Sequence, residues 1–331
     1  MNQKRITVIG PVNADILVIG RYQGDWKNSF DWTSPADISL CAAGSSGYTL
    51  QDFALLGNRT KIFSSIGDDP LGLVLTAQMN KLGIDTGMLT VHEKKKTAVA
   101  VYWLMHGNQK RPFAYELSAF PPWPQDWDGD TEDVLLNTDL LHCGGYLHYS
   151  EVYFGKTAEM FEHAKRRGVM TSIDTQFPLS PSGVKTPWMH NMTDILPYVD
   201  VLITDETEAQ MMTGEENLDR AMEGLLQYPV SVLVVKMGRE GSIIVSRKER
   251  IQQEAICVGQ TVDSIGAGDA FGAAFLTYYL EDRPLTDCAR FASTVAGFTV
   301  AAAGGVQGMP TRRQAETYMQ ENRLKGIGMK R

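Results

Sequence analysis

A glycine-rich turn leading into a helix carries the residues best suited to chemistry, namely Gly266, Ala267, Gly268 and Asp269. The first backbone N–H groups of a helix have no partner inside it, so they form a site for phosphate oxygens. The carboxylate of Asp269 would repel an anion bound there. One interpretation is that Asp269 only stabilises the start of the helix, where acidic residues are favoured. We favour a second interpretation, in which Asp269 is a base that deprotonates the group attacking a phosphoryl group.

The residues after this turn predict the helix that positions it. Phe271, Phe275, Tyr278 and Tyr279 recur at helical spacing and therefore share one helix face. Alanine and glycine residues between them would allow this helix to pack closely against a neighbour.

The stretch at 262–271, VDSIGAGDAF, resembles the C-terminal signature of the PfkB, or ribokinase-like, carbohydrate kinases. The resemblance implies an α/β fold, a ribokinase-like three-layer sandwich with a mostly parallel central sheet and a small β lid. Residues 1–331 would form a single kinase domain, with the lid built from about 14–42 and 96–119. It also implies that Asp269 is the general base and that the turn before it is an anion hole. ATP and Mg²⁺ are the implied cofactors, with K⁺ as a further candidate.

The rest of the chain predicts alternating strands and helices. A short apolar run at 6–10 indicates a first buried strand. Further along, strands at 140–143 and 169–173 flank a helix at 155–167, and another strand follows at 199–203. Such alternation favours a mostly parallel sheet with helices on its faces.

Composition limits the classes of partner. The chain has 331 residues, 43% of them hydrophobic, which is enough for a large core. A net charge of −8 argues against nucleic acid and against an anionic membrane. The N-terminus lacks the pattern of a secretory signal, and no apolar segment approaches the length of a membrane span. The four cysteines show no metal-ligand spacing, so we expect free thiols in a cytoplasmic protein.

Candidate acceptor-binding residues lie near the N-terminus. Asn13 and Asp15 follow the first strand, and turn chemistry is one interpretation of both. The resemblance implies that Asp15 binds hydroxyls of the acceptor, with Asn13 beside it. The stretch at 43–57 resembles the family's first signature, with Gly44 matching and Tyr48 at the position of a sugar-binding asparagine. A phenol offers one hydroxyl and a ring face, so the resemblance does not point to ribose. Tyr48 could contact the acceptor or belong to the core.

Two further segments complete the predicted acceptor side. A helix is expected from about residue 47 to 56, and 97–106 with 111–115 indicate a hairpin of the lid. Arg111 on this hairpin could bind a carboxylate or phosphate of the acceptor, or it could simply be solvated.

Candidate nucleotide contacts lie nearer the C-terminus. A strand at 230–236 is followed by a glycine-rich turn that resembles the family's segment beside the nucleotide. The resemblance therefore makes Lys236, Gly238 and Gly241 candidate ATP contacts, although Lys236 could be a surface lysine. Ser293 occupies the position of an asparagine often used at the nucleotide, on a long helix expected at 285–303.

Candidate cation ligands form two groups. Asp205 and Glu208 open a helix after a strand, where capping alone would explain them. The resemblance implies that they organise water around Mg²⁺. For a monovalent cation it implies five positions, mostly through backbone carbonyls: Asp263, Ile265, Val300, Ala303 and Gly305.

The leading hypothesis is ATP-dependent phosphorylation of a hydroxymethyl group on a small carbohydrate, either a sugar or a sugar acid. A nucleoside kinase of the same fold is the alternative, because the ring of Tyr48 could stack on a base. A non-catalytic binding or regulatory relative is the third, and the intact anion hole and Asp269 argue against it. A homodimer formed through the lid is a further expectation of the resemblance.

Overall fold

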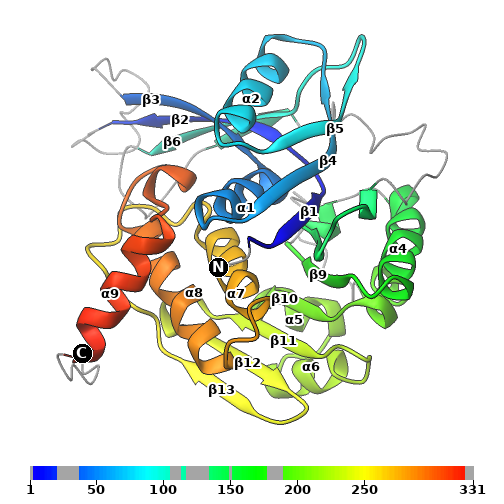
Figure 1. Cartoon of the computed structure of the whole chain (residues 1–331), viewed down its shortest axis with the longest axis vertical. Coiled ribbons are helices and arrows are strands. Elements are labelled where there is room, and N and C mark those ends of the chain that lie inside the picture. The colour runs from blue at the N-terminus through cyan, green and yellow to red at the C-terminus, as the bar shows by residue number, and fades with distance from the viewer. Residues whose placement is uncertain are drawn as a thin grey trace.

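A large β-sheet covered by helices on both faces forms the body of the protein, and a smaller sheet projects beside it (Figure 1). The computed structural model describes residues 3–20, 37–104, 113–116, 134–148, 151–176 and 189–324. This is the layered arrangement that the sequence predicts. Within the described residues, no helix is long and apolar enough to cross a membrane.

The large sheet has the strand order β13-β12-β11-β10-β9-β8-β1-β4-β5 in the described part of the chain. The strands are β1 (Arg5–Ile9), β4 (Arg59–Gly67), β5 (Asp85–His92), β8 (Leu140–Cys143), β9 (Met170–Asp174), β10 (Val201–Asp205), β11 (Val232–Lys236), β12 (Ser242–Ser246) and β13 (Arg250–Gln253). Pairing is parallel from β5 through β11, and β12 pairs antiparallel with both β11 and β13. The carboxyl ends of the parallel strands therefore meet along one edge of the sheet, where open α/β sheets bind ligands.

Two apolar cores lie on opposite faces of this sheet. One contains residues of α1 (Gly44–Leu55), α2 (Pro70–Lys81), α7 (Ala267–Tyr279), α8 (Leu285–Val300) and α9 (Arg312–Leu324). The other contains residues of α4 (Glu151–Arg166), α5 (Glu206–Thr213) and α6 (Leu218–Leu225). Neighbouring residues of β10 show the alternation, because Ile203 belongs to the first core and Leu202 to the second. Short 3₁₀ helices are η2 (Tyr146–His148), η3 (Met189–Asn191), η4 (Leu196–Tyr198), η5 (Gly238–Glu240) and η6 (Gly305–Gly308).

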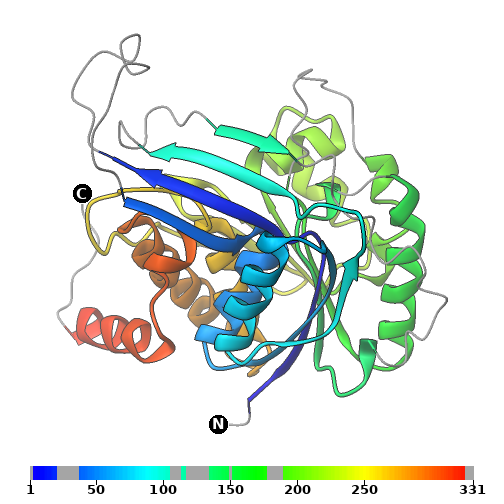
Figure 2. The same cartoon turned by 90° about the horizontal axis from the view of Figure 1, so that it is seen from above.

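The smaller sheet, which we call the lid sheet, has the order β3-β2-β6-β7. Its strands are β2 (Asn13–Ile19), β3 (Asp37–Ala43), β6 (Val99–Leu104) and β7 (Phe113–Glu116). Strand β2 is antiparallel to β3 and parallel to β6, and β6 and β7 form the hairpin expected from the sequence. Figure 2 shows these strands running side by side across one side of the molecule.

Several local expectations differ from the structure, among them the start of the helix expected at 155–167, which begins at Glu151. Asn13 and Asp15 do not form a turn after the first strand, because their backbones pair with β3 in the lid sheet. The helix expected from about residue 47 begins earlier, at Gly44, where the hydroxyl of Ser46 bonds to the carbonyls of Ile9 and Gly144 and so supports the first turn. The helix expected to reach residue 303 ends at Val300.

One half-buried carboxylate ties the lid sheet to the main body. Asp69 caps the start of α2 by accepting a 2.9 Å hydrogen bond from the backbone N–H of Gly72. The same side chain accepts 2.8 Å bonds from the backbone N–H and the hydroxyl of Thr97, two residues before β6. Asp69 therefore fixes the position at which the chain enters the lid sheet.

Candidate active site

Helix α7 presents Asp269 in its first turn, beside the backbone N–H groups of residues 266–268. The helix is preceded by Gly266, whose φ of 74° lies in the left-handed region that glycine tolerates best. Asp269 is in the first turn, and its Oδ1 accepts a 2.7 Å hydrogen bond from the hydroxyl of Ser45 and a 3.5 Å bond from that of Thr49. Ser45 and Thr49 lie one turn apart on α1, which packs against α7. Two distant segments therefore meet at this carboxylate.

The environment of Asp269 shifts its proton affinity. Burial raises the pKa of Asp269 to about 7, and the nearby carboxylate of Asp174 adds to the shift. The charge of Lys236 and the hydrogen bond from Ser45 oppose it. A carboxyl group that titrates close to neutrality is well matched to accept and release a proton at physiological pH.

Lys236 forms a buried ion pair next to the anion-hole turn. Its Nζ lies 2.7 and 3.0 Å from the two carboxylate oxygens of Asp174. A Cβ atom added to Gly268 would lie 3.3 Å from the same nitrogen. Burial alone would lower the pKa of Lys236, but the carboxylates of Asp174 and Glu208 outweigh it and raise that pKa, so the side chain stays cationic. The interpretation of Lys236 as a surface lysine is wrong, because its side chain is only 17% exposed.

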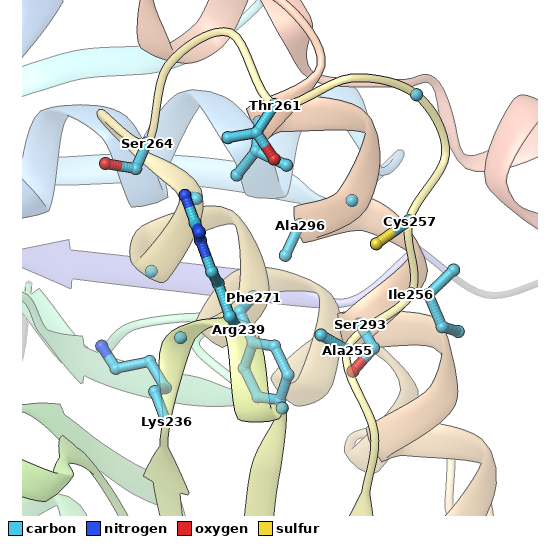
Figure 3. Close-up of a pocket in the computed structure, with 17 residues that line it drawn as sticks. Lys236, Arg239, Ala255, Ile256, Cys257, Thr261, Ser264, Phe271, Ser293 and Ala296 are labelled. Atoms are coloured by element: carbon cyan, nitrogen blue, oxygen red, sulfur yellow. The ribbon is translucent and has the colours of Figure 1, made fainter. Parts of the chain in front are cut away.

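A cavity of about 640 Å³ adjoins the anion-hole turn (Figure 3). All four candidate nucleotide contacts line it, together with two residues of the turn: Lys236, Gly238, Gly241, Ser293, Ala267 and Gly268. The structure adds lining residues that the sequence did not single out, among them Arg239, Cys257, Ser264 and Phe271. Arg239 lies between the two glycines of the predicted turn, and this position in the sequence could have identified it as a lining residue. The cavity joins the candidate nucleotide contacts to the predicted anion hole.

A second cluster gathers the predicted acceptor residues on the lid side. Asp15 accepts a 2.6 Å hydrogen bond from Nδ2 of Asn13 on one oxygen and a 2.6 Å bond from the hydroxyl of Tyr48 on the other. Gly44 lies against this cluster, since a Cβ atom there would be 2.5 Å from Oδ1 of Asn13. Burial raises the pKa of Asp15 to about 6, and the bonds from Tyr48 and Asn13 oppose that rise. Arg111 lies outside the described residues.

Tyr48 connects the acceptor cluster to the anion-hole turn. Its side chain is nearly fully buried, and the ring edge lies where a Cβ atom on Gly305 would be, at 2.5 Å from Cε1. A Cβ atom on Gly266 would lie 3.6 Å from Cδ1 of the same ring. Tyr48 thus belongs to the packed interior and also borders both clusters.

Asp205 and Glu208 form a reciprocal capping box at the start of α5. Oδ1 of Asp205 accepts a 2.7 Å bond from the Glu208 backbone N–H, and Oε2 of Glu208 accepts a 2.7 Å bond from the hydroxyl of Thr175. The capping interpretation is therefore confirmed. The described residues hold no group of three or more metal-ligating side chains. Such a donor set fits a cation that keeps most of its own water, as Mg²⁺ usually does.

Asp263 is hydrogen-bonded to two of the other positions considered for a monovalent cation, Ile265 and Val300. Its two carboxylate oxygens accept 3.2 Å bonds from the backbone N–H groups of Ile265 and Gly304. The carbonyl of Val300 accepts bonds from the N–H groups of Val262 and Asp263, at 2.7 and 3.3 Å. Asp263 thus joins the loop before α7 to the loop after α8.

The chain is similar to known proteins in both sequence and structure. A sequence model described as pfkB family carbohydrate kinase matches residues 39–312. Ribokinase from Arabidopsis thaliana is 26% identical over 318 residues, covering 93% of this chain and 79% of that protein. The 2-dehydro-3-deoxygluconokinase of Bacillus subtilis is 22% identical over 300 residues, covering 85% of this chain and 87% of the relative. A candidate ribokinase II from E. coli, solved with ATP and Mg²⁺, superposes with a TM-score of 0.78 at 20% identity, covering 96% and 99% of the two chains.

Proposed function

Because the chain belongs to the pfkB family of carbohydrate kinases, we propose that it transfers the γ-phosphoryl group of ATP to a hydroxymethyl group of a small carbohydrate. The family match and the structural neighbours confirm the ribokinase-like fold and the enzyme class predicted from the sequence, an ATP-dependent carbohydrate kinase. The proposal concerns the residues that act and the chemistry of the acceptor.

Asp269 is the general base of the proposed reaction. Among the described residues, Oδ1 accepts the side-chain hydrogen bonds from Ser45 and Thr49, which leaves Oδ2 to receive the proton. The hydroxyl oxygen of the acceptor attacks the γ-phosphorus while its proton moves to Asp269, and the bond from that phosphorus to the β–γ bridging oxygen breaks, releasing ADP. Removing a positioned base of this kind lowers rates by about 10²–10⁴-fold.

The anion hole and Lys236 stabilise the charge of the transferred group. The N–H groups of Gly266, Ala267 and Gly268 lie at the start of α7, where a helix offers them no partner of its own; that of Ala267 makes a long 3.3 Å bond to the carbonyl of Ser264. Donors fixed in advance stabilise the transition state without having to reorganise during the reaction. Lys236 stands beside Gly268, so its ammonium group can serve the same phosphates.

Asp205 and Glu208 would hold Mg²⁺ through water molecules. The metal would neutralise charge on the nucleotide phosphates. The E. coli neighbour was solved with ATP and Mg²⁺, which supports ATP and Mg²⁺ as cofactors of this protein. The chain's own contribution is the rigid capping box, which holds both carboxylates at the carboxyl end of β10.

The acceptor site consists of Asn13, Asp15, Gly44 and Tyr48, with Arg111 as a candidate for an acidic group. Asp15 already accepts bonds from two protein donors, so it has one further lone pair on each oxygen for acceptor hydroxyls. Relatives named ribokinase and 2-dehydro-3-deoxygluconokinase support a sugar or a sugar acid as the substrate class.

The observation that carries this proposal is the position of Asp269. It follows Gly268, which lines the cavity, and it is hydrogen-bonded to Ser45 on α1, the helix whose Tyr48 bonds to Asp15. The test is ADP release measured over a panel of sugars, sugar acids, sugar phosphates and nucleosides, with Asp269→Asn as the control. Activity with a sugar or sugar acid supports the proposal, and activity confined to nucleosides would establish the alternative. No acceptor giving activity above the control would contradict the kinase.

A further inference from the structure

The candidate phosphate site is rich in carboxylates. The charges of Asp174, Glu208 and Asp269 raise the pKa of Lys236. The charge of Asp205 in turn raises the pKa of Asp174. Both carboxylate oxygens of Asp174 accept hydrogen bonds from the ammonium group of Lys236, so most of the charge of Lys236 is already compensated. A nucleotide triphosphate adds further negative charge to this region. A further cation beside the cavity would offset this negative charge.

Arg239 is a cation that lines the same cavity. Figure 3 shows its side chain extending between Lys236 and Ser264, with its guanidinium end toward Ser264. Among the described residues, the exposed side chain of Arg239 makes no hydrogen bond, ion pair or aromatic contact. Arg247 is unpaired as well, but it lies outside the cavity, so what distinguishes Arg239 is its place in the cavity wall. Its guanidinium group is thus available for a ligand.

The backbone around Arg239 is fixed rather than free. Gly241 has a φ of 97°, and a Cβ atom there would lie 1.9 Å from the carbonyl oxygen of Gln253, so only glycine fits against β13. The carbonyl of Gly241 accepts a 2.8 Å bond from the N–H of Met237, and its own N–H bonds to Gly238. This turn presents Arg239 at a set place beside the cavity.

Phosphate is the ligand chemistry that suits this arrangement. The planar guanidinium group donates parallel hydrogen bonds to two phosphate oxygens and is always charged. From the geometry we infer that Arg239 is a phosphate-binding residue that holds the outer phosphates of the nucleotide. It distinguishes nucleoside triphosphates from monophosphates. The inference rests on the proposed nucleotide site and adds a residue to it.

The experiment is calorimetric titration of ATP, ADP and AMP into the wild-type protein and into Arg239→Ala, Arg239→Lys and Arg247→Ala. Arg247 is an exposed arginine on the β12–β13 hairpin, outside the cavity, and is the matched control. Loss of one charge-assisted hydrogen bond predicts that Arg239→Ala weakens ATP binding by about 10- to 100-fold. AMP binding should change little, Arg239→Lys should recover part of the loss, and Arg247→Ala should match wild type.

Two results would overturn the inference while leaving the nucleotide site intact. Equal ATP affinity in wild type and Arg239→Ala would show that the guanidinium does not contact phosphate. Equal weakening of ATP and AMP would show that the substitution disturbs the turn instead. Failure of the wild-type protein itself to bind ATP is a different outcome, because it would contradict the proposed function as well.

Discussion

The hydroxyl of Tyr48 donates a 2.6 Å hydrogen bond to Oδ2 of Asp15, and the edge of the same ring packs against Gly305. A single side chain therefore links the lid-sheet strand β2 to the loop that follows α8. Its ring also approaches Gly266 at the start of α7, so Tyr48 borders both the Asp15 cluster and the glycine-rich turn.

Tyr48→Phe should alter acceptor binding and its pH dependence. The hydrogen bond from Tyr48 lowers the pKa of Asp15, which burial holds at about 6, so its removal should raise that pKa further. Ionised Asp15 is lost as pH falls through this value, so the KM for the acceptor should begin to rise at a higher pH in the variant. Losing the donor should also cost about 1–3 kcal/mol of stability, measured by urea denaturation. An unchanged pH profile would show that Tyr48 does not act through Asp15.

Activity should follow the ionisation of Asp269. The base must be deprotonated, and its pKa is raised to about 7, so the rate should increase with pH and reach half its maximum near that value. The bond from Ser45 lowers this pKa, so Ser45→Ala should move the rising limb of the kcat profile to higher pH. Thr49→Val removes a longer bond and should move it less. A Ser45→Ala profile that coincides with wild type would contradict this role for Ser45.

Breaking the Lys236–Asp174 pair should destabilise the protein. Lys236→Met leaves the buried Asp174 carboxylate without its partner, which typically costs about 3–5 kcal/mol. The free energy of unfolding from denaturant titration measures this directly. Arg250→Met removes an exposed pair with Asp219 and should change stability little. Lys236→Met, Asp174→Asn should recover part of the lost stability, and a double variant no more stable than the single one would argue against the pair.

Dependence of the activity on K⁺ tests whether the residues around Asp263 bind a monovalent cation. We predict that ADP release is faster in KCl than in tetramethylammonium chloride at equal ionic strength. Asp263→Asn keeps the size of the side chain and removes its charge, so it should abolish the difference. Equal rates in the two salts would show that Asp263 only joins the two loops, which its bonds to Ile265 and Gly304 already do.

A homodimer through the lid sheet stays a prediction, since segments 21–36 and 105–112 of the predicted lid lie outside the described residues. Size-exclusion chromatography with light scattering decides it. The dimeric mass is expected, and a monomeric mass over a wide range of concentration would refute it.

The sequence alone was most informative where chemistry and local structure coincide. The turn before Asp269 and the start of α5 were both predictable, because glycines and caps act within a few residues. Asp174 and Ser45 were not identified from the sequence. Asp174 lies on β9 and contacts Lys236, and Ser45 lies on α1 and contacts Asp269, so both contacts form only after folding. Asp15 was identified through the resemblance, while the bond that Tyr48 gives it depends on how β2 pairs with β3.

Comparison of wild type with Asp269→Asn, with ATP binding and ADP release measured on the same preparations, tests the central claim most directly. The substitution preserves shape but cannot accept the acceptor's proton. We predict a fall of about 10²–10⁴-fold in kcat with the best acceptor, while the affinity for ATP is retained. A variant that keeps wild-type kcat would contradict the assignment of Asp269 as the base.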